Sequence, residues 1–327
     1  MADRRPWRHA PLMAHITPAT RRTLSIVDFA SLIFLGAVWG AAFLFLRIAG
    51  PEIGPAWAAE IRLAIGATLL LVVAGRQTFR VIRGRTTSFI IVGALFSAVP
   101  FTLIAIATVT LPAGFAALLN AATPLFTAVI AVAFMGQRIS ARVAAGLGIG
   151  VVAVIILVGW SPLEPGPTTI LAVAAGLGAP LSYAAAGNFA RARLSDVEPL
   201  ELATGMVTAG ALVALPVAVL SGPPGALALD GAISLVAVGV LSTAVAWPIF
   251  FRVLRHTTPT AASTATFIVP AFAIAWGSLI LAEPVGVGLI AGFGLIMVSL
   301  MLVLGISPSV HLPHIRRPAV ATRGLTG

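Results

Sequence analysis

Ionisable side chains close to the apolar stretches are the first candidates for chemistry in this chain. Glu60 and Arg62 are an acid and a base two residues apart, and an ionisable group in a membrane is a functional candidate by default. At positions i and i+2 of a helix their side chains point to different faces, so we expect no direct pair. We predict proton coupling for Glu60 and a structural role for Arg62, tying helix ends together at the bilayer rim.

Polar residues also accompany prolines inside four apolar stretches. Pro100, Pro124, Pro248 and Pro270 each lack an N–H and predict kinks that expose backbone groups. The polar neighbours are Ser97, Asn120, Thr123, Thr243, Thr264 and Thr266. Each of them either lines a substrate cavity or makes an interhelical hydrogen bond worth about 0.6 kcal/mol on average. For Asn120, the most costly uncharged group to bury among them, both interpretations stay open.

Four aromatic residues lie within apolar stretches rather than only at their ends. Trp39 and Trp247 are predicted to wall a cavity for an amphipathic solute, Tyr183 is a further candidate, and Trp276 is interpreted as packing toward lipid. The predicted substrate-cavity residues are Trp39, Ser97, Asn120, Thr123, Pro124, Tyr183, Thr243, Trp247, Thr266 and Pro270.

Several chemistries are excluded or disfavoured by composition. The chain has no cysteine, and its five histidines fall in the termini or a loop, so no metal site, cofactor or catalytic constellation is expected. All 20 basic residues are arginine, and without lysine there is no Walker-type nucleotide loop. A net charge of +10 would suit nucleic acid only if it formed one basic face. Its distribution argues for a membrane instead.

Composition predicts a chain embedded in a bilayer. The 327 residues are 59% hydrophobic and 9% charged, against about 25% charged in a soluble domain. Runs of roughly 20 apolar residues, enough to cross a bilayer, recur along the chain. They predict ten helices at about 29–48, 56–75, 88–108, 112–135, 142–160, 168–190, 200–220, 231–251, 259–281 and 285–304.

The apolar part of the chain repeats itself once. Residues from Leu111 match those from Thr257 without a gap, placing Pro124 over Pro270 (270 − 124 = 146) and Gln137 over Glu283 (283 − 137 = 146). Two repeats of five helices each must be inverted relative to one another, because five is odd. An inverted repeat with interrupted helices is typical of a transporter that has a central site.

Arginine placement predicts the orientation. With the amino terminus inside, 18 of 20 arginines face the inner side, leaving Arg47 in an outer loop and Arg62 within a span. We therefore expect a multi-pass protein of the inner (plasma) membrane with both termini cytoplasmic. The predicted division is a tail at 1–28, a first repeat at 29–160, a second repeat at 168–305 and a tail at 306–327.

Several of these features together resemble the EamA family of the drug/metabolite transporter superfamily. They are Trp39-Gly40, Arg62, Pro124 with Gly136-Gln137, Pro270 with Glu283-Pro284, and the glycine-rich stretches at 146–150 and 288–294. The resemblance covers about residues 29–305. It implies an all-α membrane protein of ten helices in two inverted repeats. The family usually has Glu where this chain has Gln137, which loses a titratable group but keeps its hydrogen-bonding reach.

This resemblance implies a secondary transporter that exports small metabolites, such as amino acids or related amphipathic compounds. The alternatives are a multidrug efflux carrier and, with less support, a channel or an intramembrane enzyme. A nearly uncharged cavity disfavours phosphorylated solutes. Gln137 and Glu283 are expected to be structural, with Glu283 bonded to loop backbone. The small-residue faces at Gly146, Gly150, Gly288 and Gly292 pack either within the chain or in a homodimer.

Overall fold

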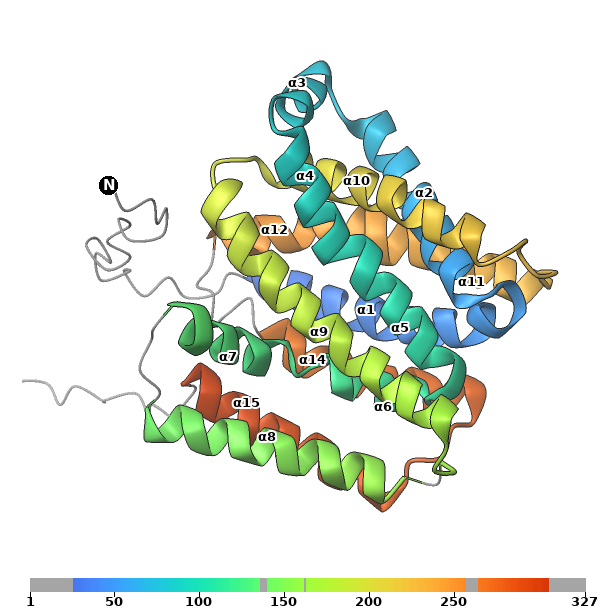
Figure 1. Cartoon of the computed structure of the whole chain (residues 1–327), viewed down its shortest axis with the longest axis vertical. Helices are drawn as coiled ribbons and strands as arrows, with labels where there is room; N and C mark the ends of the chain where they lie inside the picture. The colour runs from blue at the N-terminus through green and yellow to red at the C-terminus, as the bar shows by residue number, and fades with distance from the viewer. Residues whose placement is uncertain (1–25, 136–139, 162, 257–263, 306–327) are drawn as a thin grey trace, which may run out of the picture.

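The computed structural model describes residues 26–135, 140–161, 163–256 and 264–305, so Gln137 and most of both predicted tails lie outside it. The described residues form a bundle of helices (Figure 1). Its elements are α1 Ile26–Ile53, α2 Pro55–Val73, α3 Arg76–Gly84, α4 Thr86–Gly93, η1 Ala94–Ala98, α5 Val99–Thr110, α6 Ala113–Asn120, α7 Thr123–Met135, α8 Ala141–Gly159, α9 Pro167–Arg193, α10 Pro199–Leu220, α11 Leu229–Gly239, η2 Val240–Val245, α12 Ala246–His256, α14 Thr264–Leu281 and α15 Val287–Leu304.

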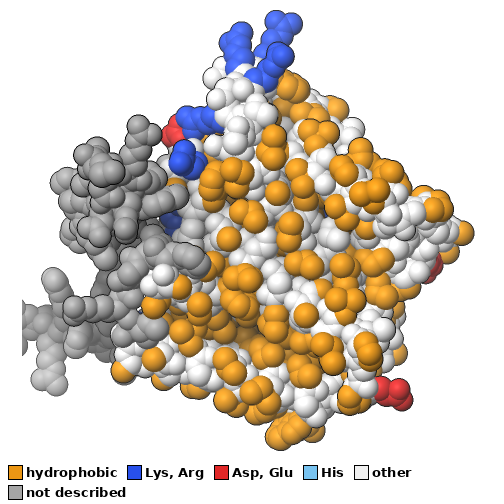
Figure 2. Space-filling view, in the orientation of Figure 1, with side chains coloured by type: hydrophobic (Ala, Val, Ile, Leu, Met, Phe, Trp, Pro, Cys, Tyr) orange, Lys and Arg blue, Asp and Glu red, His pale blue; other side chains and the backbone are white. Residues whose placement is uncertain are grey.

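Ten segments of the described chain cross the bundle, which confirms the predicted fold class. Nine are long and apolar enough to span a membrane, and the tenth contains the shorter apolar helix Phe267–Leu281. The sequence did not predict α3, a short helix in the connection after the second span, which carries Arg76, Arg80 and Arg83. Figure 2 shows hydrophobic side chains spread over the described part of the face viewed, with arginines gathered at the α3 tip. This is the surface that a lipid environment requires.

Among the described residues, three of the predicted spans are interrupted helices. The third is α4, η1 and α5, and the eighth is α11, η2 and α12, where η1 and η2 are π-helical. These two π segments start 146 residues apart (240 − 94 = 146), so they occupy the same place in the two repeats. The fourth span, predicted as one helix, is broken into α6 and α7 at Ala121 and Ala122.

Contacts between loops define two ends of the bundle. At one end, which we call the Glu283 end, Glu283 contacts Ala113, and Trp57 bonds the loop after α10. At the other, the Arg85 end, Arg85 binds Asp196. The helix α1 begins at the Arg85 end, whereas α9, the first helix of the second repeat, begins at the Glu283 end. The two repeats therefore run in opposite directions.

Each repeat packs its first helix against the other repeat. The helix α1 lies against α11 and α14, while α9 lies against α5, α6 and α7. The pairs α2 with α10 and α8 with α15 complete the arrangement. Every pairing joins one element of the first repeat to one of the second, so the interface between the repeats runs through the middle of the molecule.

Glycines allow the closest of these contacts, between α8 and α15. A Cβ at Gly146 would lie 3.0 Å from the Ser299 carbonyl oxygen, and one at Gly288 would lie 2.7 Å from that of Trp160. The hydroxyl of Ser299 also donates to the Gly146 carbonyl at 2.6 Å. The small-residue faces therefore pack within the chain, which is one of the two predicted alternatives.

Candidate substrate site

An aromatic cluster lies between the two repeats, with Trp247 at its centre. The Trp247 ring centroid is 5.2 Å from that of Trp39 and 5.3 Å from that of Phe96, which contacts it edge-on. The Trp247 side chain is 5% exposed. The aromatic cluster consists of Trp39, Phe96, Phe101, Tyr183, Trp247, Phe250 and Phe251. These residues come from α1, η1, α5, α9 and α12, so both repeats build it.

Two prolines explain why π segments occur here. Pro100 has no N–H to give to the Phe96 carbonyl one turn earlier, and Pro248 likewise cannot bond the Ala244 carbonyl. Each freed carbonyl lies inside a π segment, where the hydrogen-bond ladder changes register. Phe96 lies in η1 and Trp247 directly follows η2, and their rings contact one another across the two repeats.

Side-chain hydrogen bonds fasten each π segment to the first helix of the opposite repeat. Trp39 Nε1 donates to the Ser242 carbonyl at 3.1 Å, and the Ser242 hydroxyl returns a bond to the Val38 carbonyl at 2.9 Å. On the other side, the Ser182 hydroxyl of α9 donates to the Leu95 carbonyl of η1 at 2.7 Å. These bonds connect α1 to η2 and α9 to η1 across the interface.

Arg62 lies beside the aromatic cluster and is buried, with 3% of its surface exposed. Its Nε donates to Thr243 Oγ1 at 2.9 Å, and its guanidinium carbon is 3.6 Å from the centroid of the Phe101 ring. Thr243 lies at the middle of its span, so Arg62 connects α2 to the bundle centre and not to the rim, where the sequence placed it. A desolvated cation–π contact contributes about 2 kcal/mol, while burying a charge costs several. Phe101 alone does not offset the burial of Arg62.

Several buried polar atoms of the described chain have no hydrogen-bond partner. Trp247 Nε1, Ser97 Oγ, Glu60 Oε2 and Asn120 Oδ1 are buried and have no hydrogen-bond partner within the described chain. Each unsatisfied group costs about 1–3 kcal/mol. Thr208 Oγ1 shares this condition. Together they give the interface between the repeats a capacity for hydrogen bonds that the protein itself leaves unused.

The break in the fourth span contains three predicted residues. The helix α6 ends at Asn120, and α7 begins at Thr123 with Pro124 next to it. Thr123 Oγ1 donates to the Asn120 carbonyl at 3.0 Å, closing the turn. The equivalent of Asn120 is Thr266 (266 − 120 = 146), where α14 continues without a break.

Within α14, the structure describes the side chain of Pro270 but not that of Thr266. Pro270 is buried inside the helix. Trp276, interpreted from the sequence as facing lipid, instead donates from Nε1 to the Ala37 carbonyl of α1 at 3.1 Å. Its indole N–H therefore bonds a neighbouring helix.

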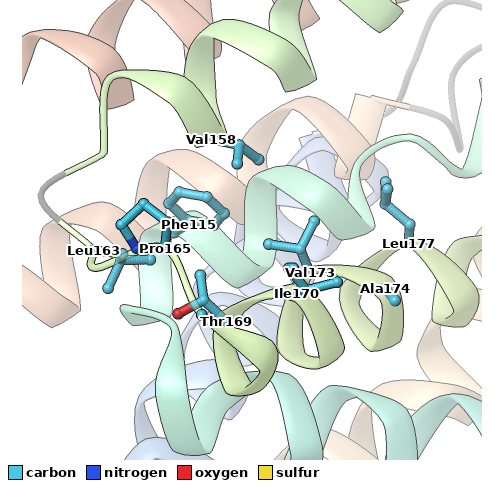
Figure 3. A pocket seen from close by; sticks show the side chains of 10 residues that line it. Phe115, Val158, Leu163, Pro165, Thr169, Ile170, Val173, Ala174 and Leu177 are labelled. Atoms are coloured by element: carbon cyan, nitrogen blue, oxygen red, sulfur yellow. The ribbon is translucent and has the colours of Figure 1, made fainter.

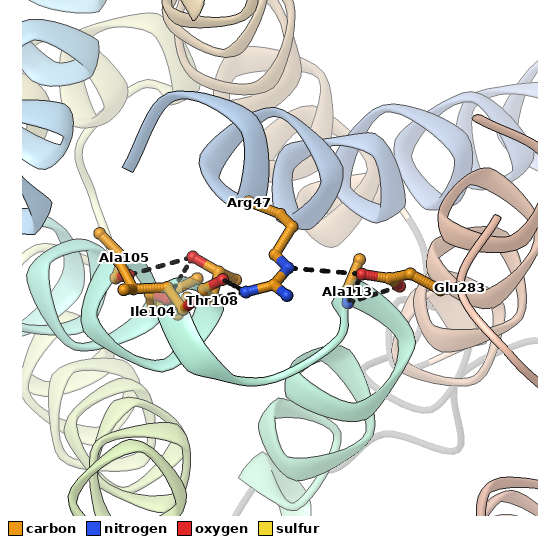
Figure 4. Close-up of polar contacts among 7 residues, drawn as sticks. Arg47, Ile104, Ala105, Thr108, Ala113 and Glu283 are labelled. Atoms are coloured by element: carbon orange, nitrogen blue, oxygen red, sulfur yellow. Dashed lines mark hydrogen bonds and ion pairs between the residues drawn. The ribbon is translucent and has the colours of Figure 1, made fainter. Parts of the chain in front are cut away.

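At the Glu283 end, a carboxylate closes the bundle (Figure 4). Glu283 Oε2 accepts from the backbone N–H of Ala113 at 2.9 Å, and its Oε1 lies 3.6 Å from Arg47 Nε. Arg47 also donates to the carbonyls of Thr108 and Val109. Arg47 belongs to α1, which runs to Ile53, and not to a loop as predicted. Burial raises the pKa of Glu283, although the Ala113 N–H and Arg47 oppose this shift.

The structure brings Trp39, Tyr183, Trp247 and Thr243 to the cluster or its edge. Ser97 instead packs against α10, where a Cβ at Gly210 would lie 2.6 Å from the Ser97 Cβ. Phe96, Phe101, Phe250 and Phe251 also belong to the cluster, although they were not predicted from the sequence. Their signal was present, because Trp247, Phe250 and Phe251 have the i, i+3, i+4 spacing of one helix face.

An apolar pocket of about 360 Å³ lies elsewhere, between α6, α8 and α9 (Figure 3). Phe115, Val158 and Ile170 are among its lining residues. None of the predicted substrate-cavity residues lines it. Ile170 is 69% exposed on the apolar outer surface, so this pocket is a groove that lipid acyl chains would fill.

These features define a class: a helical membrane protein of two inverted repeats with interrupted helices and buried, unpaired polar groups at the interface, as in membrane transporters. The model of the EamA-like transporter family matches residues 29–159 and 170–305. The chain belongs to this family.

Curated relatives agree with this assignment. The chain is 22% identical over 273 residues to an uncharacterized transporter of Archaeoglobus fulgidus, covering 81% of this chain and 94% of that protein. It is 26% identical over 291 residues to the uncharacterized transporter YvbV of Bacillus subtilis, covering 88% and 92%. A solved crystal structure with 16% identity has a TM-score of 0.59 and covers 84% of this chain and 96% of its own, which shows a shared fold.

Proposed function

We propose that this chain is a secondary-active carrier of the inner membrane that exports small amphipathic metabolites, such as amino acids or related compounds. One observation carries the proposal: the aromatic cluster lies between the repeats and includes the buried, unpaired Trp247 Nε1. Aromatic faces suit the apolar part of a solute, and an unpaired N–H suits its polar part. Alternating access would expose the cluster first at the Arg85 end, which we propose is cytoplasmic, and then at the Glu283 end.

Counterflow in proteoliposomes tests this function. Vesicles preloaded with an unlabelled amino acid should take up the labelled compound faster than empty vesicles. In a carrier, the binding site reorients across the membrane faster when it holds solute than when it is empty. A panel of amino acids, purine analogues and toxic dyes supplies the candidate solutes. Flux that grows linearly with concentration and ignores the internal solute would indicate a channel and contradict the proposal.

Two variants localise the carrier site. Trp247→Phe keeps a ring but removes the unpaired N–H, and Asn120→Ala removes the unpaired amide at the helix break. Both should lower counterflow without lowering membrane yield. Trp160→Phe is the matched control, because Trp160 is 61% exposed after α8. If the control lowers flux as much as Trp247→Phe does, the cluster is not the site.

The aromatic cluster also favours a second candidate function, efflux of planar toxic compounds. Competition separates the two, because toxic dyes would inhibit amino acid counterflow only if they share the cluster. We further propose that Glu60, which is 6% exposed with Oε2 unpaired, carries the coupled proton. Glu60→Gln should then abolish transport-linked proton movement while solute exchange continues.

A further inference from the structure

Arg62 is a buried cation that forms no ion pair with any residue that the structure describes. Within the described part of the chain it is the only buried basic residue, and its guanidinium bonds Thr243 and covers the Phe101 ring. The ion pairs there involve other arginines. Glu60, two residues away, makes no ion pair with it. A guanidinium cannot lose its proton to escape this cost.

The hydrogen-bond donors of Arg62 are mostly unused. A guanidinium carries five N–H groups in a planar fork, and among the described residues only Nε has an acceptor, the Thr243 hydroxyl. Thr243 in turn donates to the Val238 carbonyl at 3.1 Å, which holds its oxygen lone pair toward Arg62. The two terminal nitrogens remain for a ligand, and their parallel N–H bonds match a carboxylate.

A second, independent observation indicates an acceptor ligand beside the same Phe101 ring. Trp247 Nε1 is a donor that cannot accept, and it is buried without a partner. The Trp247 ring stacks on Phe101 at 6.5 Å, and Phe101 is the ring that Arg62 covers. Two residues that pack on Phe101, Arg62 and Trp247, therefore carry unpaired donors against an apolar aromatic surface.

We infer that Arg62 is the anion-binding residue of the substrate site, and that the carried solute has one carboxylate next to an aromatic or apolar body. This inference rests on the carrier function proposed above and replaces the expectation of an uncharged cavity. One buried cation suits a monoanion, whereas a phosphate ester, with about two negative charges, would leave excess charge in the core. The apolar body of the solute would lie on the aromatic cluster.

Binding to the purified full-length chain in nanodiscs tests the inference, with tryptophan fluorescence as the signal. The probes are N-acetylphenylalanine, a monoanion at pH 7.5, and N-acetylphenylalaninamide, its neutral analogue. The wild type should bind the acid at least about tenfold more tightly than the amide, or about 1.4 kcal/mol. Equal affinities, or tighter binding of phenyl phosphate than of the acid, would overturn the inference.

Substitutions separate anion binding from a purely structural role. Arg62→Gln should remove the preference for the acid while leaving affinity for the amide unchanged, and Arg62→Lys should keep part of the preference. Arg83→Gln on α3 is the matched control and should keep all of it. If Arg62→Gln retains the acid-to-amide ratio of the wild type, Arg62 is not the anion site, even where both affinities fall together.

Counterflow of the same acid distinguishes the two proposals. Trans-stimulated exchange together with an unchanged acid preference in Arg62→Gln would overturn the anion site and leave the carrier function standing. Binding of the acid without any trans-stimulation would overturn the carrier function instead.

Discussion

The two ends of the bundle are closed by different kinds of contact. At the Glu283 end, the Glu283 and Arg47 side chains are 14% and 30% exposed, and the carboxylate also accepts a backbone N–H. At the Arg85 end, Arg85 pairs with Asp196 at 2.5 Å through side chains that are 38% and 65% exposed. Arg85 lowers the pKa of Asp196 to about 2. Water screens such exposed pairs, so they contribute little to closure.

The sequence repeat explains this difference. The second helices of the repeats begin at Pro55 and Pro199, 144 residues apart, so Arg47 corresponds to Arg191 (191 − 47 = 144). Within the part of the chain that the structure describes, Arg191 bonds Asn188 of its own helix, at 3.2 Å, and nothing else. Gln137 stands where the other repeat has Glu283. The two repeats therefore carry different charges at equivalent positions, and we expect the Glu283 end to be harder to open than the Arg85 end.

Glu283→Ala should have the largest effect on this comparison. It removes a charge-assisted hydrogen bond, worth about 1.5–3 kcal/mol, which corresponds to roughly 10- to 100-fold in the opening equilibrium of the Glu283 end. The chain has no cysteine, so a single introduced cysteine reports accessibility at one position. Leu111→Cys suits this purpose, because Leu111 is 0% exposed and lies next to the Glu283 contact with Ala113. Maleimide should label it faster by that factor. An unchanged rate would mean that the carboxylate does not hold this end closed.

Glu283→Gln should have an intermediate effect. The amide oxygen can still accept the Ala113 N–H, but the attraction to Arg47 is lost, making this position resemble its Gln137 counterpart. Burial, which disfavours the charged carboxylate, outweighs this attraction in the pKa of Glu283, so we expect labelling of Leu111→Cys to rise by no more than about threefold. A rate equal to that of Glu283→Ala would show that charge, and not the backbone bond, accounts for the closure.

Asp196→Asn at the Arg85 end should change little. Its ion pair is exposed, so we expect less than about a threefold change in the labelling of Leu194→Cys, at a residue 1% exposed nearby. The effect should shrink further in high salt. A tenfold increase would mean that the two ends are closed equally firmly, which would remove the comparison.

Acid should favour closure of the Glu283 end, with the smallest effect of the series. Burial raises the pKa of Glu283 above its ordinary 4.5 in the closed state, so that state binds a proton more readily than a hydrated, open one. The resulting stabilisation is complete below 4.5 and is lost as the pH rises through the raised pKa.

The ratio of Leu111→Cys to Leu194→Cys labelling by a pyridyl disulfide, from pH 7 down to 5, measures this dependence. It should fall with pH in the wild type and stay flat in Glu283→Gln. A ratio that rises in acid would mean that the pair with Arg47 outweighs burial.

Much of the fold followed from the sequence, because apolar length and the repeat determine the spans and their inversion. The π segments were not predicted, although Pro100 and Pro248 marked their positions, because proline indicates a lost bond and not how the helix adapts. The break at Ala121 was missed for the same reason. Of the candidate site, Trp39 and Trp247 were named, but their contact depends on packing between distant helices. The burial of Arg62 at the bundle centre could not be predicted either, because it depends on the hydrogen bond to Thr243 in a distant helix.

Pairing between the repeats also has a consequence during biosynthesis. Trp39 donates to a carbonyl 203 positions later, so α1 has no partner at this position until the ribosome has added the intervening chain. At about 5–20 residues per second this takes roughly 10–40 s. During that interval the α1 face that later meets α11 and α14 is open to insertases and proteases. Helices of the first repeat are therefore where nascent-chain quality control should act.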